Sequence, residues 1–153
     1  MAGPTVGILV PKKLDDETKK NILEYFHRVA NDIRGKDFGI NGCPFIYDLG
    51  PEYPEELDEY TNITEALGWQ PQDIVGLYAM CNGKEDHIEL GKLTLAITKI
   101  VNGKVAFCDL LSRFTDDPTI LKSEDTFEFD GESIIGVKLF EEWLKHPDFY
   151  MVK

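Results

Sequence analysis

The sequence predicts a single α+β domain over residues 1–153, built on a mixed β-sheet of about five to seven strands with three or four helices. Apolar residues follow helical spacing in some segments and form short strand-like runs in others, and these segments interleave along the chain. A length of 153 residues suits one domain, and the 42% apolar fraction is ordinary for a globular protein. No repeat, linker or low-complexity tract divides the chain.

The first predicted elements are a strand and a helix. Residues 5–10 form a short apolar run that Pro11 ends, which is typical of a buried strand and too short for a signal peptide. Asp15 or Asp16 can then cap a helix. Its apolar positions recur at helical spacing: Ile22, Leu23, Phe26, Val29, Ala30 and Ile33. Gly35 ends this pattern, so we expect the helix to include Ile33.

A hairpin and a second helix are predicted next. Asn41 and Gly42 separate two short apolar runs, and both residue types tolerate the positive φ of a tight hairpin turn. After a loop rich in glycine and proline, residues 55–67 are expected to form a helix that Gly68 ends. Four residues would form its apolar side: Leu57, Tyr60, Ile63 and Leu67.

The second half of the chain continues the alternation. Residues 73–80 are apolar on both faces, which predicts a central strand. Residues 85–101 fit both helix and strand patterns; their length and the acids at their start favour a helix. A strand at 105–108 follows.

The chain is predicted to finish with a hairpin and a helix. A turn at Asp130 and Gly131 would place Phe127 opposite Ile134. Residues 137–145 then have the spacing of a short helix.

The charge of the chain narrows the range of partners. Twenty-eight acidic and sixteen basic residues give a net charge of −12, which would repel nucleic acid and anionic membranes and attract a basic protein. No apolar stretch is long enough to cross a bilayer. The three widely spaced cysteines are typical of a reducing compartment, so we expect a soluble cytoplasmic protein.

One cluster of residues could support catalysis. Cys81, Asp86 and His87 follow a predicted strand within seven residues, and a thiol with a nearby imidazole is the core of a cysteine nucleophile. The alternative is a strand end and a loop whose acids face the positive end of a helix. We expect no enzyme activity, no cofactor and no metal site, because no phosphate-binding or metal-ligand motif occurs.

Acidic residues are concentrated in the middle of the chain. Residues 37–83 hold nine acids and no lysine or arginine, and six of the acids fall within residues 48–59. Surfaces shaped for solubility alone usually mix both signs. Acids interleaved with tyrosines instead favour a binding surface for a cationic partner. The candidate partner-binding residues are Asp48, Glu52, Tyr53, Glu55, Glu56, Asp58, Glu59 and Tyr60. A second acidic stretch, residues 109–132, is the alternative interface.

Three segments resemble a bacterial family of small proteins without an assigned function. They are Met1-Ala2-Gly3-Pro4, Ala79-Met80-Cys81-Asn82-Gly83-Lys84-Glu85-Asp86-His87 with the following Leu90-Gly91-Lys92-Leu93, and Trp143-Leu144-Lys145-His146-Pro147-Asp148-Phe149-Tyr150-Met151-Val152-Lys153. The resemblance implies a helix at about 86–101 and one complete domain, with no activity attached. Small acidic bacterial proteins of this kind are similar, as a class, to immunity proteins that neutralise toxins from neighbouring cells.

Together these observations predict an immunity-type protein that binds a basic bacterial toxin, expected to be a nuclease, through the acidic segment. Two alternatives remain open. One is a small hydrolase or transferase that uses Cys81, Asp86 and His87, and the other is a housekeeping scaffold that binds other proteins.

Overall fold

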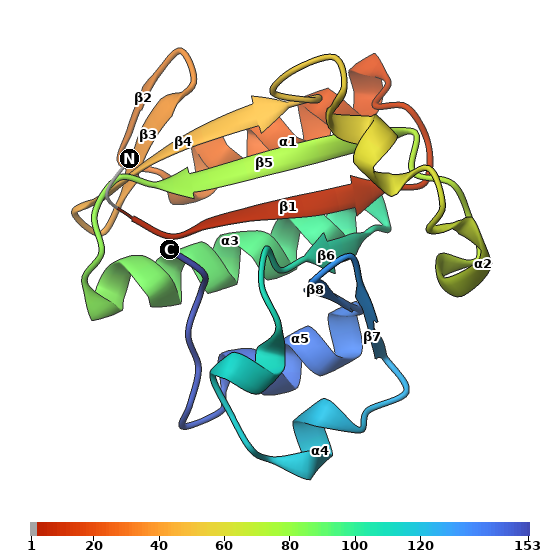
Figure 1. The fold of residues 1–153 in the computed structure, drawn as a ribbon. Coiled ribbons are helices and arrows are strands. Elements are labelled where there is room, and N and C mark those ends of the chain that lie inside the picture. Colours follow the sequence, from red (N-terminus) through yellow and green to blue (C-terminus); the bar gives the residue numbers. More distant parts are fainter. Residues whose placement is uncertain (1–2) are drawn as a thin grey trace.

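The computed structural model describes residues 3–153 and places their strands in one eight-stranded sheet, ordered β2-β3-β4-β5-β1-β6-β8-β7 (Figure 1). The strands are β1 (Thr5–Val10), β2 (Asp32–Arg34), β3 (Asp37–Ile40), β4 (Cys43–Leu49), β5 (Asp73–Ala79), β6 (Lys104–Ala106), β7 (Thr126–Phe129) and β8 (Glu132–Ile135). The helices are α1 (Asp16–Val29), α2 (Thr64–Leu67), α3 (Lys84–Val101), α4 (Pro118–Leu121) and α5 (Val137–Leu144), with the 3-10 helices η1 (Glu56–Tyr60) and η2 (Leu111–Arg113).

The predicted α+β class is confirmed, and the sheet is one strand larger than the predicted range. Every strand pairing among residues 3–153 is antiparallel, where a mixed sheet was expected. The reason lies in the connection through α3. That helix leads from β5 to β6, and β1 lies between these two strands and pairs with both in the antiparallel sense.

The main core lies between one face of the sheet and the helices α1, α3 and α5 (Figure 1). Alternate residues of β1, such as Ile8, face this layer and are fully buried. The α1 side contributes Phe26, whose ring stacks on Phe38 of β3. The α5 side contributes Trp143, which packs edge-on against Phe107.

The opposite sheet face, which we call the open face, carries a smaller cluster. Leu9, Ile74, Ala106 and Ile134 form its floor, and Tyr60 and Ile63 from the η1–α2 segment pack onto it. Small residues lie side by side across the strands next to this cluster. Gly7 of β1 is in register with Gly76 of β5 and with Ala106 of β6. The η1–α2 segment therefore lies across part of the open face, as Figure 1 shows at the upper right.

The first helix is shorter than its apolar spacing predicted. It ends at Val29, because Ala30 is extended (φ −84°, ψ 146°). Ile33 belongs instead to β2, where it pairs with Phe38. Its side chain packs against the same core as the helix, which explains why it fitted the helical pattern. The N-cap is Asp15, whose side chain accepts a hydrogen bond from the Thr18 N–H.

The predicted helix over residues 55–67 is wrong as one element. The segment forms η1, a turn and the four-residue α2. Crowded acids at helical neighbour positions, such as Glu55 and Glu59, disfavour a regular helix. Tyr60 and Ile63 are nevertheless buried, since they face the sheet. Gly68 ends α2 at φ 90°, as expected.

Several further elements agree with the sequence, but the strand predicted at 105–108 forms β6 and ends at Ala106, since Cys108 has a φ of 69°, and α4 and η2 had no predicted counterpart. Asn41 and Gly42 have φ values of 50° and 83° in the β3–β4 turn, and Phe127 pairs with Ile134 across the β7–β8 hairpin. Residues 84–101 are helical, and β5 is central and buried.

Candidate functional site

Carboxylates from two distant segments meet over the open face. Glu52, Glu56 and Glu59 come from η1 and the loop before it, and Glu132 is the first residue of β8. The Tyr60 hydroxyl donates a 3.0 Å hydrogen bond to Glu132 Oε2, and the Cys108 N–H donates one of 3.1 Å to Oε1. Together with two neighbouring acids these residues form a surface that we call the acidic face: Asp48, Glu52, Glu56, Glu59, Asp130 and Glu132.

The electrostatics of Glu56 show that the acids act on one another. Burial is the main cause that raises the pKa of its carboxyl, and the charges of Glu52, Glu59 and Asp48 raise it further. Only the hydrogen bond from the Glu52 N–H opposes these effects. A cation placed next to the Glu56 carboxylate would therefore stabilise its ionised form.

Glu132, which the Tyr60 hydroxyl contacts, is in a similar electrostatic environment. Burial raises the pKa of its carboxyl, and the charges of Glu59 and Asp130 add to that. The bonds from the Cys108 N–H and the Tyr60 hydroxyl act in the opposite direction, because they stabilise the ionised form.

Tyrosines accompany these acids. Tyr53 is 42% exposed, and its hydroxyl donates a short hydrogen bond to Glu59, which is the main cause that raises the Tyr53 pKa to about 12. The Tyr78 hydroxyl lies 3.4 Å from Glu52 Oε2. Tyr60 is buried, so it anchors the segment and is not a contact surface.

The other predicted binding residues divide into two groups. Asp48 is half-buried and forms a 2.7 Å ion pair with Lys36, so a base from just outside the acidic stretch neutralises it. Glu55 and Asp58 are exposed and lie on the same segment. Among residues 3–153 their carboxylates make no hydrogen bond or ion pair, and neither is among the main causes that shift the pKa of Glu56 or Glu132.

The two acidic stretches of the sequence, residues 48–59 and 109–132, come together only in part in the fold. Asp130 and Glu132, at the end of the stretch 109–132, reach the acidic face. Asp117, from the middle of that stretch, instead bonds His146 at the far end of the chain. The sequence carried no local signal for this division, because it depends on β8 lying next to β6.

The cluster of Cys81, Asp86 and His87 is not arranged as a nucleophile and its base. His87 Nε2 bonds Asn82 Oδ1 at 2.8 Å, and His87 Nδ1 accepts the Met151 N–H at 3.0 Å. Both ring nitrogens are therefore occupied, and burial lowers the pKa of the imidazole. Asp86 Oδ2 accepts the Gly83 N–H at 2.9 Å and so caps α3. Cys81 is exposed.

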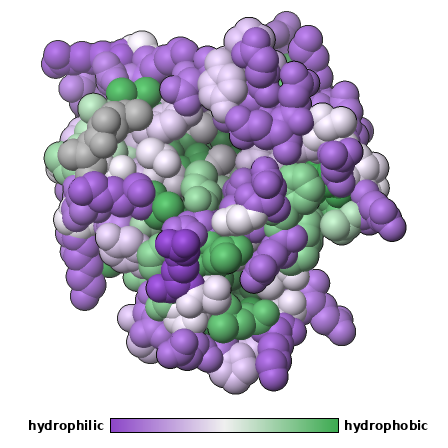
Figure 2. Space-filling model, in the orientation of Figure 1, coloured by the Kyte–Doolittle hydropathy of each residue, from purple (hydrophilic) through white to green (hydrophobic). Residues whose placement is uncertain are grey.

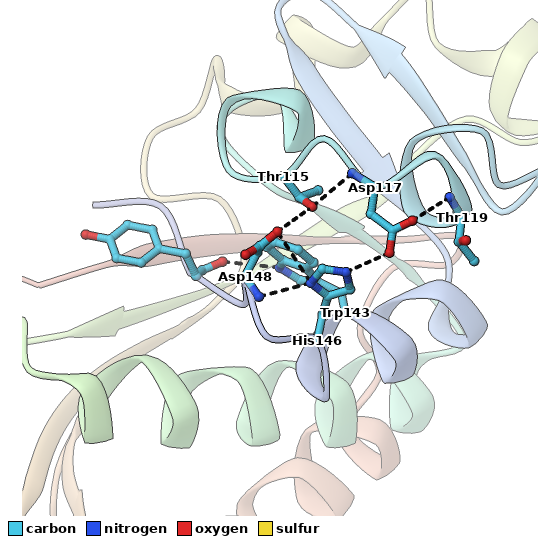
Figure 3. A network of polar contacts seen from close by, with 7 residues as sticks. Thr115, Asp117, Thr119, Trp143, His146 and Asp148 are labelled. Atoms are coloured by element: carbon cyan, nitrogen blue, oxygen red, sulfur yellow. Dashed lines mark hydrogen bonds and ion pairs between the residues drawn. The ribbon is translucent and has the colours of Figure 1, made fainter.

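His146 is held in the same way, as Figure 3 shows. Its Nε2 lies 2.9 Å from Asp117 Oδ2, and its Nδ1 accepts the Asp148 N–H at 3.0 Å. The Thr115 hydroxyl donates to Asp148 Oδ2 at 2.8 Å, and the Trp143 indole N–H donates to the Tyr150 carbonyl at 3.2 Å. This network fixes the C-terminal segment against the residues before α4.

The described parts of the three segments that carried the family resemblance meet in space, with Pro4 and its neighbour Thr5 standing for the first of them. The Ala79 N–H donates to the Pro4 carbonyl at 2.9 Å, and the Thr5 N–H donates to the Val152 carbonyl at 2.8 Å. His87 receives the Met151 N–H. These segments therefore form one junction between the chain start, the first turn of α3 and the C-terminal segment.

Within residues 3–153 no group of three or more histidine, cysteine, aspartate or glutamate side chains is placed to hold a metal ion. No helix in this part of the chain combines the length and apolarity required to span a membrane.

The comparisons with known proteins give a family and no activity. Residues 2–153 match the model described as "Family of unknown function (DUF6368)", and the chain belongs to that family. No curated protein and no solved structure matches the chain.

Proposed function

We propose that this member of the DUF6368 family is a binding protein whose acidic face captures a basic protein. Within that class we propose an immunity-type protein that neutralises a basic bacterial toxin, with a nuclease as the expected target. The observation that supports this most directly is that Glu59 acts on the carboxyls of both Glu56 and Glu132, and so links the acids of the η1 segment to those of the β7–β8 hairpin.

In the free protein, burial and neighbouring negative charges oppose the ionisation of both Glu56 and Glu132. A lysine or arginine placed beside either carboxylate would stabilise its ionised form, and the net charge of −12 would attract a basic partner. Such steering raises association rates from about 10⁵–10⁶ toward about 10⁸–10⁹ M⁻¹s⁻¹ at low salt.

The target class follows from the same charges. A nuclease binds the phosphates of its substrate with a cationic cleft, and an acidic surface that covers such a cleft excludes the nucleic acid. Tyr53 adds an exposed, rigid aromatic side chain beside the carboxylates, which suits a tight interface.

The test compares two charge reversals in one segment, with the toxin domain encoded by the neighbouring gene as the probe. The face variant carries Glu52→Lys and Glu59→Lys. The control carries Glu55→Lys and Asp58→Lys, which change the net charge equally, whereas only Glu52 and Glu59 of these four acids are main causes of the raised pKa of Glu56.

In stopped-flow measurements we expect the face variant to associate about tenfold more slowly or worse, with a flatter salt dependence, and the control to change much less. Equal effects of the two variants would overturn the acidic face as the interface. A neighbouring gene that encodes no secreted toxin would count against the immunity role.

A further inference from the structure

A pocket of about 450 Å³ lies between the first turn of α3 and the C-terminal segment, and the acidic face contributes nothing to it. Its apolar walls come from both sides: Ile88, Leu144, Pro147, Phe149 and Tyr150. Four polar side chains complete it: Asn82, Lys84, His87 and His146. Mostly apolar walls with a few fixed polar groups, at this volume, are typical of sites for small organic molecules.

The pocket is preformed, because hydrogen bonds hold its polar walls. His87 bonds Asn82 and Met151, and its ring lies tilted against that of Tyr150 with centroids 4.2 Å apart. The Tyr150 ring is held further by stacking on Phe114. His146 is held by Asp117 and by the Asp148 N–H, and its ring stacks on Trp143 (Figure 3). A ligand would therefore bind rings that are already ordered, so little side-chain conformational entropy would be lost on binding.

The charge of the lining is the reverse of the charge of the protein. Lys84 supplies an ammonium group, and among the described residues 3–153 no carboxylate lines the pocket. Among residues 3–153 the Lys84 ammonium takes part in no ion pair, whereas Lys36, Lys92 and Lys99 each have a carboxylate partner. Glu85 and Asp86 follow Lys84 in α3; Asp86 is directed to the Gly83 N–H, and Glu85 does not line the pocket.

Part of the aromatic wall faces solvent. Tyr150 is 37% exposed and Pro147 is also exposed, beside the partly buried Phe149. A planar ring placed against these residues would remove apolar surface from water, and an anionic group on that ring would reach the Lys84 ammonium.

We propose that this pocket binds a small planar aromatic carboxylate. The ring packs against Phe149 and Tyr150, and the carboxylate pairs with Lys84. This site is independent of the proposed toxin binding, since it shares no residue with the acidic face.

The test uses three probes with one ring system: indole-3-acetate, indole and tryptamine, titrated into the ¹⁵N-labelled full chain and followed by NMR. We expect indole-3-acetate to bind most tightly, indole more weakly and tryptamine most weakly, with shifts at the amides of Asn82, Phe149 and Tyr150. A protein of net charge −12 would non-specifically prefer the cationic tryptamine, so that opposite order would overturn the proposal.

Three variants locate the site. Lys84→Met should weaken indole-3-acetate about fivefold and leave indole unchanged, whereas Lys138→Met, an exposed lysine on α5, should change neither. Ile88→Trp should fill the pocket and abolish both. Binding that survives Ile88→Trp in a folded protein, or no detectable binding of any probe to the unmodified chain, would refute the assignment.

Discussion

The Tyr60 hydroxyl donates a 3.0 Å hydrogen bond to Glu132 Oε2, and this bond joins residues 72 positions apart. Tyr60 is the last residue of η1, and its ring also stacks on Phe129 of β7 at 6.1 Å. The bond therefore fastens the acidic segment to the β7–β8 hairpin. The same contact that stabilises the fold also brings the two groups of carboxylates together.

Removal of this hydroxyl should lower stability measurably. Tyr60→Phe keeps the ring but leaves the half-buried Glu132 without one of its two donors, so we expect a loss of about 1–2 kcal/mol in the free energy of unfolding. Chemical denaturation measures it. Tyr53→Phe is the matched control, because the Tyr53–Glu59 bond is exposed, and it should cost less than about 0.5 kcal/mol. Equal losses for the two variants would contradict this account.

The raised pKa of Glu132 predicts how stability depends on pH. The folded state holds a proton on this carboxyl at a pH where the unfolded chain has lost it, so this group's contribution to stability falls as pH rises from the unfolded pKa through the raised folded pKa. Glu132→Gln removes that titration. Its amide can still accept from the Cys108 N–H and donate to the Tyr60 oxygen.

We therefore expect Glu132→Gln to be more stable relative to the parent at pH 7 than at pH 4, as followed by thermal unfolding across that range. A difference between the two proteins that does not change with pH would show that Glu132 titrates normally in the fold.

The sequence predicted well those features that depend on neighbours in the chain. Asn41-Gly42 and Asp130-Gly131 determined two hairpins, because few other residue pairs adopt the required positive φ. The acids at the start of residues 85–101 correctly favoured the helix α3. These signals act within a few residues and need no tertiary context.

Features that depend on the order of strands in the sheet could not be predicted from the sequence. Glu132 belongs to the acidic face only because β8 follows β6 and β1 in the sheet, and nothing near Glu132 in the chain shows that. The end of the first helix was predicted too late because Ile33 fits the helical spacing. Ile33 is in fact a residue of β2 whose side chain packs against the same core. His87 and His146 share no motif, yet the fold places both in one pocket.

A glycine beside the central strand offers a test of close packing. A Cβ at Gly103 would collide with the Leu9 carbonyl oxygen, a backbone atom of β1 that cannot turn aside. We expect Gly103→Ala to destabilise the protein by about 2 kcal/mol or more. Gly39→Ala in β3 is the control, because a Cβ there would lie 3.9 Å from its nearest neighbour, the Cys43 carbonyl oxygen. Similar denaturation midpoints for the two variants would refute the packing argument.

The three cysteines should differ sharply in reactivity. Burial raises the pKa of Cys43 to about 11. Cys108 is exposed as a residue, but its Sγ faces the Ala106 carbonyl, and desolvation of the thiol together with the Glu132 charge raises its pKa to about 12. At pH 8 very little of either thiol is therefore the reactive thiolate. Cys81 is exposed, and the imidazole nearest to it in sequence is fully occupied. We expect iodoacetamide at pH 8 to label Cys81 first, as read by peptide mass spectrometry, and Cys81→Ser to remove the fast phase. A labelling rate of Cys81 that stays high down to pH 6 and depends on His87 would show a thiolate–imidazolium pair. That result would favour the hydrolase or transferase alternative. It would count against purely structural roles for Asp86, which caps α3, and for His87, which bonds the Met151 N–H.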